Sequence, residues 1–134
     1  MRISKVDGYL EIARAVSKRS TCLRRQYGAI IVRNDEILAT GYNGSARGEI
    51  NCCDSKECYR ERNNIPHGEQ YEKCVGVHAE MNAIMSAGRS KCIGSTLYLV
   101  GFENREEIEA KPCLICERLI KNSGIKFVRR CLLD

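Results

Sequence analysis

Two short segments, well separated in sequence, carry nitrogen and sulfur donors that can bind one metal ion only if the fold brings them together. The first is His78-Ala79-Glu80, and the second is Pro112-Cys113-Leu114-Ile115-Cys116. Zinc favours this mixture of imidazole and thiolate, and a catalytic zinc keeps three protein ligands and leaves its fourth position to water. His78, Cys113 and Cys116 supply three ligands, and Glu80 remains to handle protons. The rest of the chain is therefore expected to act as a scaffold that joins these segments.

The overall composition is that of one globular domain. The chain has 134 residues, of which 43% are hydrophobic and 29% charged, and this length suits a single core. It contains no run of about 18 apolar residues, so no membrane span is expected. The first five residues lack the apolar core of a signal peptide, and we therefore expect a cytoplasmic protein.

Nine cysteines in a chain of this size call for an explanation. The odd number, the absence of a secretory signal and the Cys-x-x-Cys spacing favour metal ligation over disulfides. The net charge of +5 suits a phosphorylated substrate or a nucleic acid. A merely solvated basic surface explains that charge equally well.

The pattern of apolar residues predicts alternating helices and strands around one insertion. Helices are predicted over residues 5–19, 78–87 and 112–124, and strands over 28–33, 36–42, 95–100 and 125–129. Residues 103–111 are charged and are expected to be exposed. The order α-β-β-insertion-α-β-α-β predicts a three-layer α-β-α domain with helices packed on both sides of a mixed sheet.

The insertion, residues 43–76, differs from the rest of the chain. It is rich in glycine, poor in aliphatic residues and contains four cysteines. Irregular segments of this length are uncommon in compact domains unless they are functional or cross-linked. We therefore expect a single domain over residues 1–134 with a metal-stapled insertion.

His78 and Cys113 each stand at the start of a predicted helix. The partial positive charge of helix N-termini stabilises thiolates and a metal-bound hydroxide, and zinc brings the pKa of its bound water near 7. Glu80 is placed to take a proton from that water and return it to a ring nitrogen and a leaving amine. A lone Cys-x-x-Cys is as often structural or redox-active, but the combination with His78 and Glu80 is typical of zinc deaminases.

The segment from His78 to Ile84 together with Pro112-Cys113-x-x-Cys116 resembles the cytidine deaminase superfamily. Gly41-Tyr42-Asn43-Gly44 and the upstream segment from Thr21 to Ile30 resemble its deoxycytidylate (dCMP) deaminase branch, and the likeness extends over residues 19–125. This resemblance implies a cytidine-deaminase-like fold and the hydrolysis of dCMP to dUMP with release of ammonia, a step that feeds thymidylate synthesis.

The resemblance also implies roles for individual residues. It assigns His78, Cys113 and Cys116 to the catalytic zinc and Glu80 to proton shuttling. It further places Asn43 against the substrate and the backbone N–H of Ala79 near the pyrimidine carbonyl. An ordinary turn at Asn43-Gly44 is the alternative reading of that segment.

Members of the dCMP branch often carry a second, structural zinc in the region of the insertion. The matching positions are Cys22, Cys52, Cys58 and Cys74, which would form a closed four-thiolate site, with Cys53 or His67 as alternatives. Free buried cysteines are the competing explanation, and Cys92 and Cys131 are read as simple core or surface residues.

Selectivity for a phosphorylated substrate requires cations near the site. The candidates are Arg24, Arg25, Arg47 and Lys111, because arginine suits bidentate contact with phosphate.

Many family members are hexamers controlled by dCTP and dTTP, so the resemblance implies a homo-oligomer (hexamer or dimer) and a nucleotide effector, with Mg²⁺ as its companion ion. The alternatives are a deaminase for dCTP or for a tRNA or DNA base, although low aromatic content makes nucleic acid a poor partner, and a zinc-binding module without catalysis.

Overall fold

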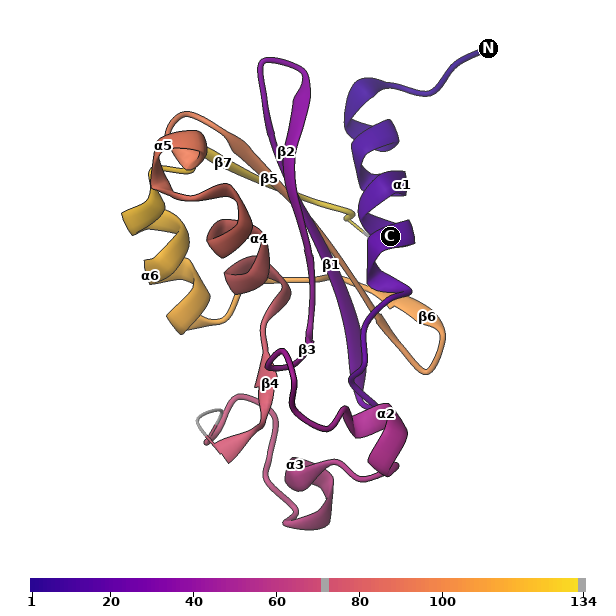
Figure 1. The fold of residues 1–134 in the computed structure, drawn as a ribbon. Coiled ribbons are helices and arrows are strands. Elements are labelled where there is room, and N and C mark those ends of the chain that lie inside the picture. Colours follow the sequence, from indigo (N-terminus) through magenta and orange to yellow (C-terminus); the bar gives the residue numbers. More distant parts are fainter. Residues whose placement is uncertain (71–72, 133–134) are drawn as a thin grey trace.

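A five-stranded mixed sheet forms the centre of the domain, as seen in the computed structural model, which describes residues 1–70 and 73–132. Its strands are β1 (Arg25–Arg33), β2 (Glu36–Tyr42), β5 (Thr96–Glu103), β6 (Glu106–Ile108) and β7 (Phe127–Arg130). The order is β2-β1-β5-β6, and β7 pairs with the same edge of β5 as β6. Only β7 runs parallel to its neighbour, so the predicted mixed sheet is confirmed (Figure 1).

Helices cover both faces of this sheet. The helix α1 (Lys5–Ser17) packs on one face, while α4 (Ala79–Ala87), the short α5 (Arg89–Cys92) and α6 (Leu114–Ser123) lie on the other (Figure 1). Strand β1 shows the reason, because its side chains alternate between the two faces. Ile30 and Val32 pack in a cluster with Leu10 of α1, whereas Ala29 and Ile31 belong to the cluster that contains α4. The three-layer α-β-α architecture predicted from the sequence is confirmed.

Two glycines allow helices to approach the sheet closely. A Cβ atom on Gly28 would lie 2.1 Å from the carbonyl oxygen of Ala13 in α1, and one on Gly41 would lie 2.4 Å from that of Ala79 in α4. No side chain fits at these distances. The second contact fixes the first turn of α4, which carries the candidate catalytic segment.

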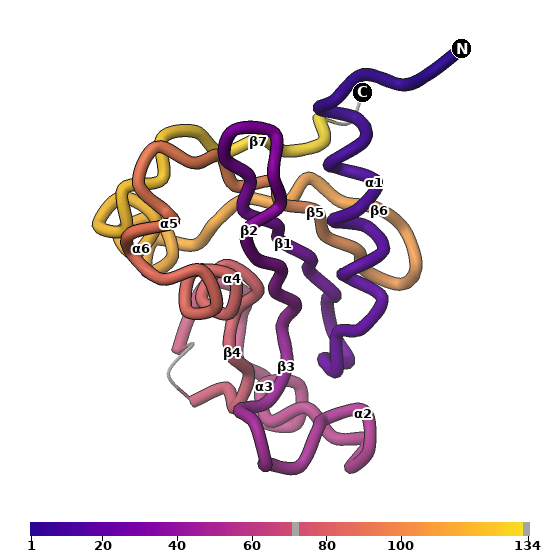
Figure 2. The backbone as a smooth tube through the Cα atoms, turned by 45° about the horizontal axis from the view of Figure 1, so that its top comes forward, coloured from indigo at the N-terminus to yellow at the C-terminus, as the bar shows by residue number. Residues whose placement is uncertain are grey.

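The described residues of the insertion, 43–70 and 73–76, form a separate lobe at one end of the sheet (Figures 1 and 2). The lobe leaves and re-enters the core through β3 (Gly44–Ser45) and β4 (Gly76–Val77), which pair antiparallel. Between them the described part contains two one-turn helices, α2 (Cys52–Ser55) and α3 (Tyr59–Arg62).

Several predicted boundaries were wrong. Residues 103–111 are not simply an exposed segment, because they contain β6, which returns along β5 after a turn at Asn104 and Arg105, both with positive φ. Charged side chains are common on edge strands, and here they concealed the strand. The sequence also missed α5, started β1 three residues late and extended α1 beyond Ser17. Within residues 1–70 and 73–132, no helix has both the length and the apolar character that crossing a membrane requires.

Candidate active site and metal centre

The two donor segments meet at the N-termini of α4 and α6. His78 is the N-cap residue of α4 and Cys113 that of α6, where its sulfur accepts a hydrogen bond from the backbone N–H of Cys116. His78 Nδ1 lies 3.2 Å from Cys116 Sγ and 3.6 Å from Cys113 Sγ. In the described part of the chain, this is the only group of three potential ligands whose donor atoms all lie within 4.8 Å of one another.

These distances fit a tetrahedral zinc ion. Zn–N and Zn–S bonds of about 2.1 and 2.3 Å place the two donor atoms about 3.6 Å apart. Burial lowers the pKa of His78 and so favours the neutral imidazole that metals bind. Burial also raises the pKa of the Cys116 thiol, with the Glu80 carboxylate and Cys113 contributing in the same direction. A bound cation reverses this effect and deprotonates a coordinating thiol.

Glu80 is a buried carboxyl group next to the donors. It lies in the first turn of α4, and only 5% of the residue is exposed. Burial raises its pKa above the usual value for a glutamate, which brings the group closer to the range in which a carboxyl accepts and releases protons at neutral pH. A buried carboxyl that serves only the fold is rare, because it costs free energy unless it is paired.

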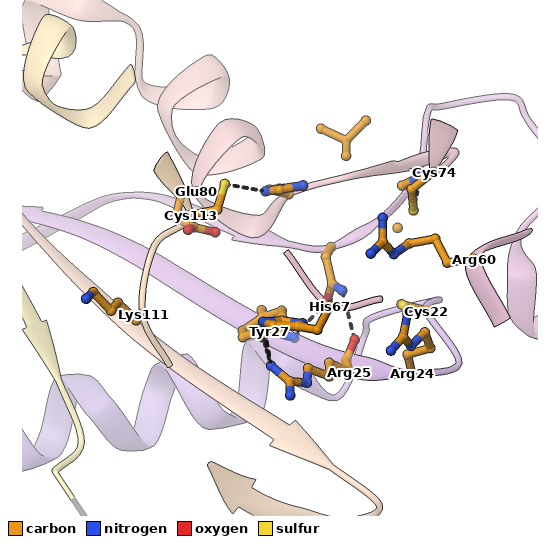
Figure 3. A pocket seen from close by; sticks show the side chains of 15 residues that line it. Cys22, Arg24, Arg25, Tyr27, Arg60, His67, Cys74, Glu80, Lys111 and Cys113 are labelled. Carbon is orange, nitrogen blue, oxygen red and sulfur yellow. Dashed lines mark hydrogen bonds between the residues drawn. The ribbon is translucent and has the colours of Figure 1, made fainter. Parts of the chain in front are cut away.

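A pocket extends from these residues to the insertion (Figure 3). Glu80 and Cys113 lie on one side of it, and Arg24, Arg60, Cys22 and Cys74 lie on the other. The described residues that line it are Cys22, Arg24, Arg25, Tyr27, Asn43, Gly44, Arg60, His67, Cys74, Gly76, Val77, His78, Glu80, Lys111 and Cys113. The metal donors and Glu80 at one end of the pocket and the arginines at the other suit a small anionic substrate.

The predicted substrate contacts line this pocket, with two exceptions, Arg47 and Ala79. Arg24, Arg25 and Lys111 line it, whereas Arg47 lines a second groove beside Tyr42 and Asn82. Ala79 is fully buried at the first position of α4, where a backbone N–H has no acceptor within its own helix. The contact of this N–H with the pyrimidine carbonyl, implied by the family resemblance, remains a prediction.

Asn43 also lines the pocket, but its amide is engaged by the protein. Its Oδ1 accepts hydrogen bonds from the Ser20 hydroxyl at 2.6 Å and from the Tyr27 backbone N–H at 2.8 Å, and its Nδ2 donates to the Arg25 carbonyl at 2.9 Å. Asn43 thus fastens the segment before β1 to the end of β2. The contact with substrate implied by the family resemblance remains a prediction.

Three of the four cysteines predicted for a second zinc lie near enough to the fourth, Cys52, to influence its thiol. Burial raises the pKa of Cys52, and the thiols of Cys22, Cys58 and Cys74 raise it further. The alternative ligands are engaged elsewhere: the exposed Cys53 sulfur is 3.9 Å from the Asp54 carboxylate, and His67 Nε2 is 3.5 Å from Arg25 Nη1. Among these six described residues, no three donor atoms lie within 4.8 Å of one another, so the second zinc site and its ligands remain predictions.

Two polar side chains of the lining, those of Tyr27 and Arg60, were not predicted as site residues. Tyr27 lies in β1, where its side chain reads as an ordinary strand residue. Arg60 lies in the irregular insertion, and no periodicity or spacing distinguishes it from Arg62. Arg60 differs from Arg62 in being buried, and only the folded structure shows this difference.

Comparisons with known proteins agree with this geometry. A family model described as the cytidine and deoxycytidylate deaminase zinc-binding region matches residues 3–131. The deoxycytidylate deaminase of Schizosaccharomyces pombe is 36% identical over 120 residues, which cover 90% of this chain but only 34% of that protein. The deoxycytidylate deaminase of Mycobacterium phage D29 is 36% identical over 125 residues, covering 90% of this chain and 88% of that protein.

A solved structure shows the same fold. The dCMP deaminase of cyanophage S-TIM5, determined in complex with dCMP and dUMP, superposes with a TM-score of 0.66 at 29% identity, covering 96% of this chain and 81% of that one. The match with the family model spans nearly the whole sequence and includes every donor of the metal centre. The chain therefore belongs to the cytidine and deoxycytidylate deaminase family of zinc-binding proteins.

Proposed function

We propose that this protein deaminates dCMP hydrolytically to dUMP and releases ammonia. The observation that carries the proposal is the buried carboxyl of Glu80 beside three zinc donors, in a pocket whose far end is lined by arginines. The relatives described above are named for this reaction, and the phage relative is matched over most of its length. The chain spans about a third of the yeast relative, so the proposal concerns this domain.

Each residue of the centre has a distinct task in the reaction. His78, Cys113 and Cys116 hold the zinc, which supplies Lewis-acid activation of water when bound. Glu80 takes a proton from the attacking water and delivers it to the ring nitrogen of cytosine, then passes the second proton to the departing amine. The C4–N bond is replaced by a C4–O bond, and ammonia leaves. The Ala79 N–H holds the pyrimidine carbonyl and so fixes the ring beside Glu80.

The proposal is tested by measuring ammonia released from dCMP, dCTP, deoxycytidine and tRNA by the zinc-loaded protein. We expect turnover of dCMP with a kcat/KM well above that for deoxycytidine. A preference for dCTP or for tRNA would transfer the same chemistry to one of the alternative substrates. Release of ammonia from none of the four would refute the enzymatic function.

We also infer a second, structural zinc ion bound by Cys22, Cys52, Cys58 and Cys74. The effect of Cys22, Cys58 and Cys74 on the Cys52 thiol supports it, because a shared cation would stabilise all four groups as thiolates. Such an ion would stabilise the insertion, which has little regular structure of its own.

Other expectations come from the family resemblance or, for the cellular location, from the sequence composition. Control by dCTP and dTTP, a role for Mg²⁺ with the effector, assembly into a hexamer or dimer and a cytoplasmic location stay predictions. Size-exclusion chromatography with light scattering tests the assembly, and turnover of dCMP measured with dCTP or dTTP, each with and without Mg²⁺, tests the control by effectors.

A further inference from the structure

We propose that Arg60 is a positioning residue that fixes residues 66–69, here called the pocket loop, so that His67 determines specificity for the substrate phosphate. The inference rests on the proposed function, because it concerns how a nucleotide is distinguished from a nucleoside. Arg60 and His67 both lie in the insertion, outside the segments that carry the reaction.

Arg60 anchors the pocket loop from within the protein. It is 4% exposed, and its guanidinium donates hydrogen bonds to the backbone carbonyls of Pro66 at 2.6 Å and Glu69 at 2.5 Å. Pro66 also accepts from the backbone N–H of Glu69, which closes a turn around His67. Two fixed donors on one planar group define the position of this turn, and lysine cannot reproduce that geometry.

His67 is the pocket-loop residue that reaches the cationic end of the pocket. Its Nε2 lies 3.5 Å from Arg25 Nη1, and a guanidinium only donates, so this nitrogen is the acceptor. Partial burial lowers the pKa of His67, and Arg25, Arg24 and Arg60 lower it further, whereas Glu103 acts in the opposite direction. Among the described residues that shift this pKa, three arginines act against one carboxylate, a balance that suits an anionic ligand.

The surroundings of this cluster fit a phosphate better than a carboxylate of the protein. Among the described lining residues, Glu80 is the only acid, and it lies on the opposite side of the pocket (Figure 3). Arg24 pairs with the carboxylate of Glu61 at 3.7 Å, and Arg25 with that of Glu103 at 3.5 Å. Neither glutamate lines the pocket, and both side chains are substantially exposed. Exposed pairs at such distances are weak, so a phosphate can displace them and gain charge-assisted hydrogen bonds from the arginines and His67.

The test compares ligands that differ only in the phosphate. Binding of dUMP and of deoxyuridine to the zinc-loaded protein is measured by calorimetry, and kcat and KM are measured for dCMP and deoxycytidine. We expect His67→Asn and Arg60→Met to reduce the preference for dUMP over deoxyuridine about tenfold or more, to raise KM for dCMP and to leave kcat close to that of the unmodified protein. Arg62→Met is the matched control, because Arg62 lies in the same helix but is exposed and paired with Glu57; it should change neither value.

The Arg60→Lys variant separates position from charge. A positioning role predicts that it resembles Arg60→Met, because its single ammonium cannot hold both carbonyls; retention of the full preference would refute that role. An unchanged preference in His67→Asn would refute the role of His67, even if the Arg60 variants fail to fold. Binding of dUMP needs no turnover, so the two proposals can fail separately. A protein that prefers dUMP but releases no ammonia would refute only the proposed reaction. An active protein whose variants keep the full preference for dUMP would refute only this inference.

Discussion

The Asn43 amide donates a hydrogen bond to the backbone carbonyl of Arg25 across 2.9 Å, which ties the end of β2 to the start of β1. The same side chain accepts from Ser20 and from the backbone of Tyr27. Asn43 therefore sets the course of the backbone from which Arg25 enters the pocket. Asn43, which is expected to contact the substrate, thus also holds two other lining residues, Arg25 and Tyr27, in place.

Replacing Asn43 with alanine should impair both stability and substrate affinity. The partly buried N–H of Tyr27 and carbonyl of Arg25 would lose their partners, at about 1 to 3 kcal/mol for each group left unsatisfied. We expect a lower melting temperature and a higher KM for dCMP. Asn43→Asp is the matched variant, since it retains the acceptor but loses the donor to Arg25; a wild-type KM in both variants would contradict the role of Asn43 in placing Arg25.

Glu80→Gln should abolish turnover without releasing the metal. The amide is nearly isosteric but cannot transfer protons, so kcat should fall by about 10²- to 10⁴-fold, while zinc content by mass spectrometry stays unchanged. Glu117→Gln is the control, because Glu117 occupies the first turn of α6 beside Cys116 but is exposed. Substantial activity in Glu80→Gln would exclude Glu80 as the proton carrier.

Gly41→Ala should displace α4 from the sheet. The added methyl group would meet backbone atoms of Ala79 and Ala83 at 2.4 and 2.5 Å, and backbone yields less readily than a side chain. We expect a loss at or above the upper end of the usual 1 to 3 kcal/mol for overpacking, about 3 kcal/mol, together with weaker zinc binding because His78 begins this helix. Urea unfolding and zinc analysis measure the two effects.

Gly8→Ala is the control for that experiment. A Cβ at this position in α1 would make only an ordinary contact, at 3.8 Å from Ile3. The substitution should raise the free energy of unfolding by about 0.5 to 1 kcal/mol through helix propensity. A similar loss in both variants would show that steric fit against α4 is not what makes Gly41 necessary.

The contact between Tyr9 and Asp35 should make stability depend on pH in the alkaline range. The hydrogen bond to Asp35 is the main cause that raises the pKa of Tyr9 from 10.0 to about 12. A group with a raised pKa in the folded state stabilises fully below its unfolded value, and this contribution disappears as the pH rises through the folded value. The difference in melting temperature between the wild type and Tyr9→Phe should therefore be constant up to about pH 10 and vanish by about pH 12. A difference that does not change with pH would contradict this linkage.

Cys58→Ser should remove one of two zinc ions. If four thiolates bind the structural ion, metal analysis should show a decrease from about two zinc ions per chain to about one, with a lower melting temperature. Cys53→Ser, adjacent to a proposed ligand but exposed, should retain both ions. One zinc ion in the wild type would eliminate the second site, and loss of an ion in Cys53→Ser would reassign its ligands.

The sequence predicted what depends on local pattern or on donor chemistry. Alternation in β1 and the helical spacing in α1 define faces, and the layers follow from burying them. The metal donors were recognisable because His78, Cys113 and Cys116 combine residue types that zinc prefers with positions at helix starts.

Other features depend on tertiary contacts that leave no periodic signal. The charged residues of β6 form a strand only because the edge of β5 is available to pair with them. The burial of Arg60 depends on how an irregular segment folds around it. The extent to which Asn43 bonds to the protein depends on Ser20, Arg25 and Tyr27, which are distant from it in sequence.

The pairing of β3 with β4 brings the two ends of the insertion together, so the insertion joins the core at one place. The chain leaves and rejoins the core within two residues on each side, at Gly44–Ser45 and Gly76–Val77. His78, Glu80 and the Cys-x-x-Cys segment all lie outside these junctions, whereas Arg60 and His67 lie inside them. Exchange of the segment between these strands is therefore expected to change which nucleotide the domain prefers, provided that Cys52, Cys58 and Cys74 are kept for the proposed structural zinc, while the groups that move protons keep their positions.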